Sequence, residues 1–218
     1  MKFTRGFFPL ALLLAGVCPA AFGAVTFTNT PSAVSNTYSG FITLQIGGLT
    51  SGDTVIVRKF LDVNTNGIVD SADQLVQQFN LTDNQPGQVI GTVTNFNVPG
   101  DTNMTAGAVT TSLNFQNGDF VQNLVGKYRY VLSSPAGHFS PLTNSFIVTN
   151  FPFAQKFTGN VVSNITGVAL SNAIVLLFPP PRSGHGGPGQ PVGGTVANNA
   201  GAYTIAAPPG TYTLASSV

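Results

Sequence analysis

Short stretches of alternating apolar and polar residues recur along the chain from residue 25 to residue 150. The alternation is clearest over residues 54–58 and 128–132. A two-residue period is typical of strands that bury one face. The pattern predicts seven strands, separated by turn residues, at 25–29, 41–46, 54–61, 89–95, 109–115, 128–133 and 146–149. Seven short strands in this arrangement predict an all-β fold, with a β-sandwich of immunoglobulin-like type over residues 24–150.

One segment of this region departs from the two-residue period. Residues 71–79 place Leu75, Val76 and Phe79 on one face of a helix, with Asp73 near its start. This spacing predicts a short helix of two turns. Further along, residues 126–130 are predicted to form a late sandwich strand with a structural tyrosine, and an aromatic ligand platform is the less favoured interpretation.

A second region begins after Phe151-Pro152-Phe153 and contains no acidic residue. Its apolar residues again fall in short segments, at 157–162, 173–177, 195–198, 201–205 and 208–214. The pattern resembles the carboxypeptidase regulatory-like domain, a relative of the collagen-adhesin B-type and transthyretin-like sandwiches. The residues that carry this resemblance are Gly159, Ala173, Val175, Leu177, Thr195, Asn198, Gly201, Tyr203, Gly210, Tyr212 and Leu214. The resemblance implies a second small structural sandwich over residues 151–218, without peptidase activity.

This second region also departs from that family. Eleven of the sixteen residues from 179 to 194 are Pro or Gly, which predicts an exposed, mobile loop in place of a strand. Lys156 could be the lysine of the Lys–Asn crosslink known in collagen-adhesin relatives, but the region lacks the acid that promotes it. The sequence stops at Val218, about where a last strand is expected. Either that strand is absent or the chain is a piece of a longer protein.

The first 23 residues have the three parts of a signal peptide. Lys2 and Arg5 provide a positive start, residues 7–17 are apolar, and small residues precede a cleavage site before Ala24. A membrane anchor fits less well because the apolar stretch is shorter than the ~20 residues that span a bilayer. A lipoprotein signal at Cys18 fits less well because the residue before it is the branched Val17. We therefore expect a secreted, cell-surface or periplasmic protein.

Charged residues make up only 7% of the chain, and all seven acidic residues are Asp. Water-exposed helices normally display Glu and Lys, so this composition favours strands. Cleavage before Ala24 would leave six basic and seven acidic residues, a net charge of −1, and no cysteine. The mature chain then has no disulfide, no membrane span and no electrostatic basis for binding nucleic acid.

One run of residues carries recognisable metal chemistry, from Asp62 to Asp73. Oxygen side chains fall at its first, third, fifth, ninth and twelfth positions, and Gly67 occupies the sixth. Ca²⁺ takes six to eight oxygen ligands, and a tight loop can present alternate side chains to one ion if a glycine makes a sharp turn. The predicted ligands are Asp62, Asn64, Asn66, Asp70 and Asp73, with the carbonyl oxygen of Ile68.

The run is similar to a dockerin-type or EF-hand-like calcium loop, with Asp in place of Glu at its end. Only one such loop is present, so the resemblance does not extend to the cohesin partner of dockerins. The other interpretation is an Asp/Asn/Gly-rich turn that binds nothing. A formal charge of −3 with two neutral amides predicts a modest affinity, in the range of about 0.1–1 mM that extracellular modules often show, and a structural role for the ion.

No other grouping of residues predicts catalysis. Asp101 is expected to cap a turn rather than to join a second ion site. His138 and His185 have no second His or acid nearby in the sequence, and no nucleophile or phosphate-binding pattern is present. We therefore expect a non-enzymatic, bacterial extracellular protein of adhesion, surface assembly or accessory type, with an unidentified protein or glycan partner. A carbohydrate-binding accessory module is the alternative, although the chain has no Trp for a sugar platform.

Overall fold

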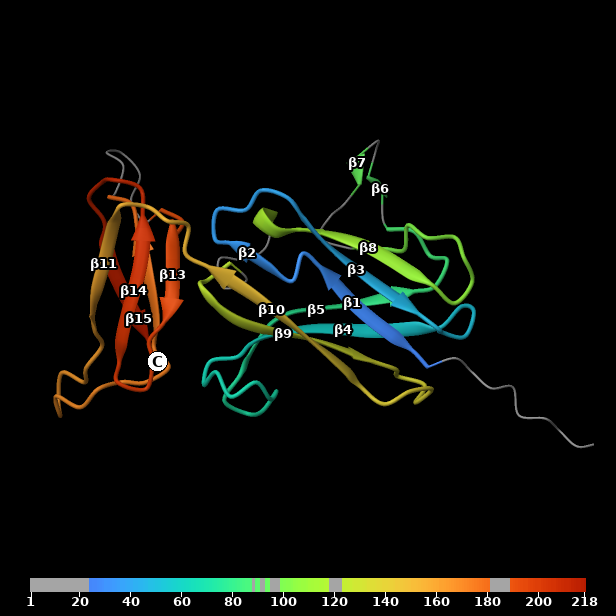
Figure 1. The fold of residues 1–218 in the computed structure, drawn as a ribbon, viewed down its shortest axis with the longest axis horizontal. Coiled ribbons are helices and arrows are strands. Elements are labelled where there is room, and N and C mark those ends of the chain that lie inside the picture. The colour runs from blue at the N-terminus through green and yellow to red at the C-terminus, as the bar shows by residue number, and fades with distance from the viewer. Residues whose placement is uncertain (1–23, 88, 91–92, 95–98, 118–122, 181–188) are drawn as a thin grey trace, which may run out of the picture.

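A computed structural model describes residues 24–87, 89–90, 93–94, 99–117, 123–180 and 189–218 (Figure 1). The predicted signal peptide, residues 1–23, lies outside the described residues, and so do Arg182 and His185. Over the described residues the fold is all-β, as the alternation pattern predicts, and the only helical element there is a single 3-10 turn, η1, at Phe115–Asn117. None of the described helices is long and apolar enough to cross a membrane.

The first sandwich consists of two main sheets and a small ribbon. One sheet has the order β1-β3-β8, and the other has the order β2-β10-β9-β4-β5. Neighbouring strands are antiparallel except for β2, which runs parallel to β10. The strands are β1 (Thr26–Thr30), β2 (Ala33–Ser35), β3 (Phe41–Gly47), β4 (Thr54–Leu61), β5 (Gln74–Thr82), β6 (Val89–Ile90), β7 (Val93–Thr94), β8 (Val109–Asn114), β9 (Gly126–Ser133) and β10 (Leu142–Thr149).

The core of the first sandwich lies between these two sheets and follows the predicted alternation. In β4, every second residue from Val55 to Leu61 is buried, and in β9 the buried residues are Tyr128, Tyr130 and Leu132. Phe146 of β10 packs against both tyrosine rings, at centroid distances of 6.1 and 5.8 Å. Burial of one face of each strand supplies the main driving force for this arrangement.

Most of the predicted strands are confirmed. The segment 54–61 is strand β4 with the predicted bounds, and the others shift by a few residues at their ends. The predicted strand at 89–95 is instead the two-residue strands β6 and β7, which pair with each other and with no other described strand. The short strand β2 was not predicted because three residues are too few to establish a period.

The predicted helix over residues 71–79 is wrong, because the segment from Gln74 onward is strand β5 at an edge of the five-stranded sheet. The pairing with β4 shifts by one residue, so that Lys59 lies opposite Gln77 and Phe60 opposite Leu75. The extra residue, Val76, forms a β-bulge. Both Val76 and Phe79 therefore pack on the core although they are three residues apart. A bulge in a strand produced the spacing that indicated a helix.

The second sandwich also has two small sheets, in the orders β11-β14 and β13-β12-β15. Its core is the cluster Val175, Leu177, Ile205 and Ala207. A strand at the end of the chain, β15, pairs antiparallel with β12. The strands are β11 (Gln155–Asn160), β12 (Ile174–Phe178), β13 (Gly193–Val196), β14 (Ala202–Ala207) and β15 (Thr213–Ser217).

The predicted Gly/Pro loop ends two residues too late, because Gly193 and Gly194 belong to β13. Close packing explains why glycine occupies this position of the strand. A Cβ atom there would lie 2.8 Å from the carbonyl oxygen of Val175 and would also collide with the side chain of Leu124. Glycine is the residue that lets three segments approach this closely.

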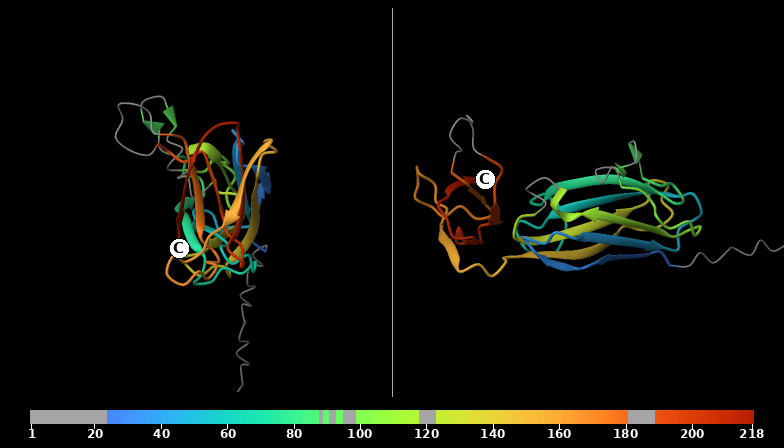
Figure 2. Two further views of the ribbon diagram at one scale, coloured as in Figure 1. Left: turned by 90° about the vertical axis from the view of Figure 1, so that its left-hand side faces the viewer. Right: turned by 90° about the horizontal axis from the view of Figure 1, so that it is seen from above.

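The two sandwiches contact each other directly, and the second lies at the end of the first that is opposite to the start of β1 (Figures 1 and 2). Val125 donates its N–H to the Gly194 carbonyl at 2.9 Å, and the Thr195 hydroxyl donates to the Val125 carbonyl at 3.1 Å. The side chain of Asn150 makes two further hydrogen bonds with β14. Apolar residues of the second sandwich also pack on the core of the first, namely Ile174, Leu176 and Val196.

Candidate metal centre

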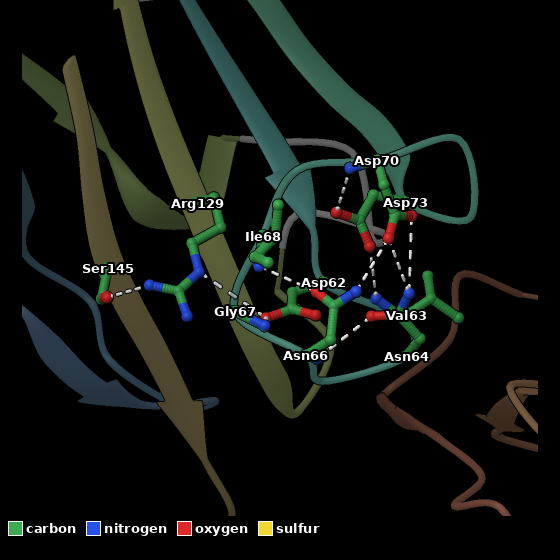
Figure 3. A network of polar contacts seen from close by, with 10 residues as sticks. All are labelled: Asp62, Val63, Asn64, Asn66, Gly67, Ile68, Asp70, Asp73, Arg129 and Ser145. Atoms are coloured by element: carbon green, nitrogen blue, oxygen red, sulfur yellow. Dashed lines mark hydrogen bonds and ion pairs between the residues drawn. The ribbon is translucent and has the colours of Figure 1, made fainter.

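The loop from Asp62 to Asp73 connects β4 to β5 at one end of the five-stranded sheet. Its first residue is fixed by a hydrogen bond in which the Asp62 N–H donates to the Lys127 carbonyl at 2.9 Å. Its last residue closes the loop, because the Asp73 carboxylate accepts the Val63 N–H at 3.2 Å. The run of predicted ligands is therefore one closed loop anchored to the sheet (Figure 3).

Gly67 makes the sharp turn that the sequence predicts. Its φ is +82°, in the left-handed region that glycine adopts without strain. The turn directs the Gly67 N–H toward the start of the loop, where it donates to Oδ2 of Asp62 at 3.0 Å. The first and sixth positions of the loop are thereby brought together.

Two predicted ligands, Asn64 and Asn66, turn their side-chain amides toward a third, Asp70. The Asn66 amide donates to Oδ2 of Asp70 at 2.8 Å, and the Asn64 amide donates to the same oxygen at 3.1 Å. Oδ1 of Asp70 accepts the Ala72 N–H at 2.8 Å. These bonds, that of Ala72 first, stabilise the charged form and hold the pKa of Asp70 below its ordinary value.

Asp73 has the opposite electrostatic environment. Partial burial is the main cause that raises the pKa of Asp73 above its ordinary value, and the nearby charges of Asp62 and Asp70 raise it further. Hydrogen bonds from the N–H groups of Asp70 and Val63 act in the other direction. The raised pKa of Asp73 therefore reflects first the loss of water around its carboxylate and only secondarily the nearby negative charges.

Asp62 is the most buried of the predicted ligands, with only 1% of its surface exposed. Its Oδ2 accepts the Gly67 N–H and lies 3.6 Å from Nε of Arg129. Its Oδ1 is buried and has no hydrogen-bond partner. Buried carboxylate oxygens are normally satisfied, because leaving one without a partner costs about 1–3 kcal/mol or more.

The donor set fits Ca²⁺, a hard cation that binds oxygen, because every predicted ligand offers oxygen. Hydrogen bonds join Asn64, Asn66 and Asp73 to Asp70. The Asp62 carboxylate accepts the Gly67 N–H instead and makes no hydrogen bond with these four residues among the described contacts. The Ile68 side chain is exposed, and its N–H donates to Oδ1 of Asn66 at 2.8 Å. Among the described residues, however, no three Asp, Glu, His or Cys side chains gather as a metal-holding group. The two amides bond to Asp70, so an ion at this site would have to replace those bonds.

Asp101 caps turns, as predicted from the sequence. Its carboxylate is buried and accepts the N–H groups of Asn84, Asn103 and Thr110 at 2.8–2.9 Å.

The structural role predicted for the tyrosine of β9 is also confirmed. Tyr128 is fully buried and donates its hydroxyl to the Leu124 carbonyl at 2.8 Å, so it offers no platform for a ligand.

Sequence reasoning missed two charged contacts because each joins distant parts of the chain. His138 was expected to have no acid nearby, but its Nδ1 lies 3.0 Å from the carboxylate of Asp53. Arg129 was not assigned a role, but its guanidinium lies beside Asp62. Nothing in the sequence indicated that Lys59 is buried. It is 2% exposed in the core, and its Nζ lies 4.5 Å from the centre of the Tyr128 ring.

The chain matches no protein-family profile and no curated protein sequence. Among solved structures, it is similar to macromomycin (14% identity, TM-score 0.32), covering 58% of this chain and 100% of that one. It is also similar to murine CRIg (14% identity, TM-score 0.30), covering 59% of this chain and 99% of that one. The major pilin subunit of Bacillus cereus, BcpA, gives 12% identity and a TM-score of 0.23, covering 88% of this chain and 58% of that one.

Proposed function

We propose that this chain is a non-enzymatic exported protein of surface or adhesion type, whose first sandwich is stabilised by a calcium ion bound in the loop 62–73. The observation that carries the proposal is Oδ1 of Asp62, which is buried and without a hydrogen-bond partner. A cation at this oxygen would remove the cost of burying it unsatisfied. The neighbouring donors are at the spacing that a calcium loop requires.

The position of the loop explains why the ion would be structural. The loop connects β4, which is central in its sheet, to β5, which lies at the sheet edge and is held there only by β4 among the described strands. An edge strand loses its place more readily than a central one. An ion that fixes the loop would therefore fix the start of β5. At about 100 times its dissociation constant, a bound ion adds about 2.7 kcal/mol to stability.

Two sequence features support an exported protein. The first 23 residues have the pattern of a signal peptide, and the chain after them has no cysteine. In the absence of disulfides, a bound ion is one means by which an exported sandwich can gain stability. The affinity expected of a loop with three carboxylates, about 0.1–1 mM, suits an extracellular module.

Calcium titration of the mature protein by isothermal titration calorimetry tests the proposal. We expect one binding event, and we expect millimolar Ca²⁺ to raise the melting temperature relative to EDTA. Magnesium should replace calcium poorly, because it needs a smaller octahedral site and keeps its water.

Paired variants with the same chemical change localise the effect. Asp62→Asn removes one charge from the loop but keeps an oxygen to accept the Gly67 N–H, so calcium binding should weaken by tenfold or more, an order-of-magnitude expectation for one ligand charge. Asp53→Asn removes a carboxylate outside the loop and should leave calcium binding unchanged. A melting temperature that does not respond to 10 mM Ca²⁺ would contradict the calcium proposal.

A further inference from the structure

Arg129 lies outside the predicted ligand set, but its guanidinium is part of the loop's surroundings (Figure 3). In β9, Tyr128 and Tyr130 point into the core, so Arg129 points to the outer face of the sheet. Nη1 of Arg129 donates to Oγ of Ser145 on the neighbouring strand β10. The guanidinium is therefore held between β10 and the start of the loop.

The loop is shaped around this guanidinium. A Cβ atom on Gly67 would lie 2.7 Å from Nη2 of Arg129, so a side chain at the sixth position of the loop would displace the guanidinium. Nε of Arg129 is buried without a hydrogen-bond partner and lies 3.6 Å from Oδ2 of Asp62. The Arg129 side chain is 19% exposed and that of Asp62 is 0% exposed, so solvent screens this ion pair only partly.

We propose that Arg129 is a fixed counter-cation of the loop. Its guanidinium neutralises part of the negative charge of the loop when no ion is bound, and it lowers the affinity of the loop for calcium. This inference rests on the calcium site proposed above. Arg129 pairs with Oδ2 of Asp62 and has only N–H donors to offer, so it cannot itself bind the ion and acts on the site through its charge. It is a positioning and affinity-setting residue for the loop.

The electrostatics give the direction of the effect. With no ion bound, the positive charge of Arg129 offsets the repulsion among three carboxylates and keeps the loop closed. With Ca²⁺ bound, the same charge repels the ion. A unit charge roughly 7 Å from a divalent ion in a water-like medium weakens binding by about tenfold. The loop therefore stays folded at low calcium, and its affinity is lower than its three carboxylates alone would give.

Calorimetric titration of Ca²⁺ into three variants of the mature protein tests this. Arg129→Gln removes the charge and should tighten calcium binding by about tenfold. Arg129→Lys keeps the charge and should bind calcium within about twofold of wild type, an order-of-magnitude bound from the same Coulomb relation. Arg58→Gln is the control for net charge, because Arg58 lies on the same outer face of β4 but four residues from Asp62, roughly 13 Å along the strand. Its affinity should tighten by no more than about threefold, which is what the same Coulomb relation gives at that distance, and by less in salt.

The melting temperatures separate this role from simple packing. Arg129→Gln should be less stable than wild type in EDTA, and saturating calcium should restore most of the difference. A purely structural arginine would lower both melting temperatures equally and would not tighten binding. Ser145→Ala, which releases the guanidinium without removing it, should shift affinity in the same direction by a smaller factor, so it provides a second test if Arg129→Gln fails to fold.

The outcomes distinguish the two proposals. If the wild-type protein binds no calcium, the calcium proposal fails and this inference fails with it. If the wild type binds calcium but Arg129→Gln binds it equally or more weakly, the calcium site stands and the role of Arg129 is overturned. The same holds if Arg58→Gln tightens binding as much as Arg129→Gln, because the effect then comes from net charge.

Discussion

The two sandwiches of this chain are similar in architecture but differ in what stabilises them. Among the residues that the structure describes, the first has a cluster of twenty buried apolar residues, while the core cluster of the second has four. All seven acidic residues precede residue 151, whereas the second region has none. The first sandwich can therefore combine a large core with charged and capping contacts. The second has neither a large core nor any acidic group.

The second sandwich compensates through its contact with the first. A region of fewer than about 70–80 residues rarely has enough core to be stable alone, and this chain has no disulfide available after residue 18. Three of its partly buried apolar residues pack on the core of the first sandwich, Ile174, Leu176 and Val196. The comparison shows that the boundary between the regions is a packed interface, whereas the sequence alone indicated only a change of composition.

Gly194→Ala should produce the largest difference in stability between the two sandwiches. The added Cβ would lie 2.8 Å from the Val175 carbonyl and would press on Leu124, so the interface must open or shift. Overpacking of this kind costs about 1–3 kcal/mol. We expect the second sandwich to become less stable and the first to change little, measured by hydrogen exchange of the two sets of strands.

Gly193→Ala is the matched control for that variant. Its Cβ would lie 3.5 Å from the nearest atom, in Ile205, which is an ordinary contact. Its effect on hydrogen exchange should be small. Equal effects of the two variants would mean that the sandwiches do not depend on this close approach.

The next largest effect is a dependence of the free energy of unfolding on pH, which only the first region should show. Burial lowers the pKa of Lys59 in the first core from 10.5 to about 7. Between these two values the unfolded chain binds more protons than the folded one, so stability should rise with pH by roughly 1 kcal/mol per unit from about pH 7 to pH 9. Below pH 7 this contribution no longer changes. The second region has only an exposed lysine, Lys156, and should show no such dependence.

Urea unfolding at pH 6, 7, 8 and 9 in constant calcium measures this dependence. Lys59→Met keeps the apolar volume and should give a flat profile over the same range. Measurements should stop below about pH 9.5, because burial also raises the pKa of Tyr128 and Tyr130. Above that pH the tyrosines ionise in the unfolded chain but stay neutral in the folded protein, which lowers the free energy of unfolding. A flat wild-type profile from pH 7 to 9 would show that Lys59 keeps its charge in the core.

What could be predicted from the sequence depended on how far apart the interacting residues are. The strand β4 and the loop 62–73 are contiguous, so their periods and spacings appear directly in the sequence. Val76 misled the prediction because a bulge placed two apolar residues at helical spacing. The contacts of Arg129 with Asp62, and of Leu124 with Gly194, join residues about 70 positions apart, and only the folded topology places them together.

The smallest effect should come from the surface pair of Asp53 and His138, which lies in the first sandwich. The pair is close, at 3.0 Å, but the His138 side chain is 46% exposed, so water and salt screen the interaction. Exposed ion pairs contribute about 0–1 kcal/mol, and this one is charged only when His138 is protonated. We expect His138→Gln to change the free energy of unfolding by less than about 1 kcal/mol at pH 7.

Asp53→Ala should cost more than His138→Gln, because the Asp53 carboxylate also accepts the Thr50 N–H at 3.1 Å and thereby fixes the turn before β4. Urea unfolding of both variants at low and high salt makes the comparison, and only the His138 contribution should fade with salt. If His138→Gln instead destabilised the protein as much as Asp53→Ala, the surface ion pair would matter to the first sandwich as much as the Asp53 turn contact does. The contrast between the two regions would then lie in charge as well as in core size.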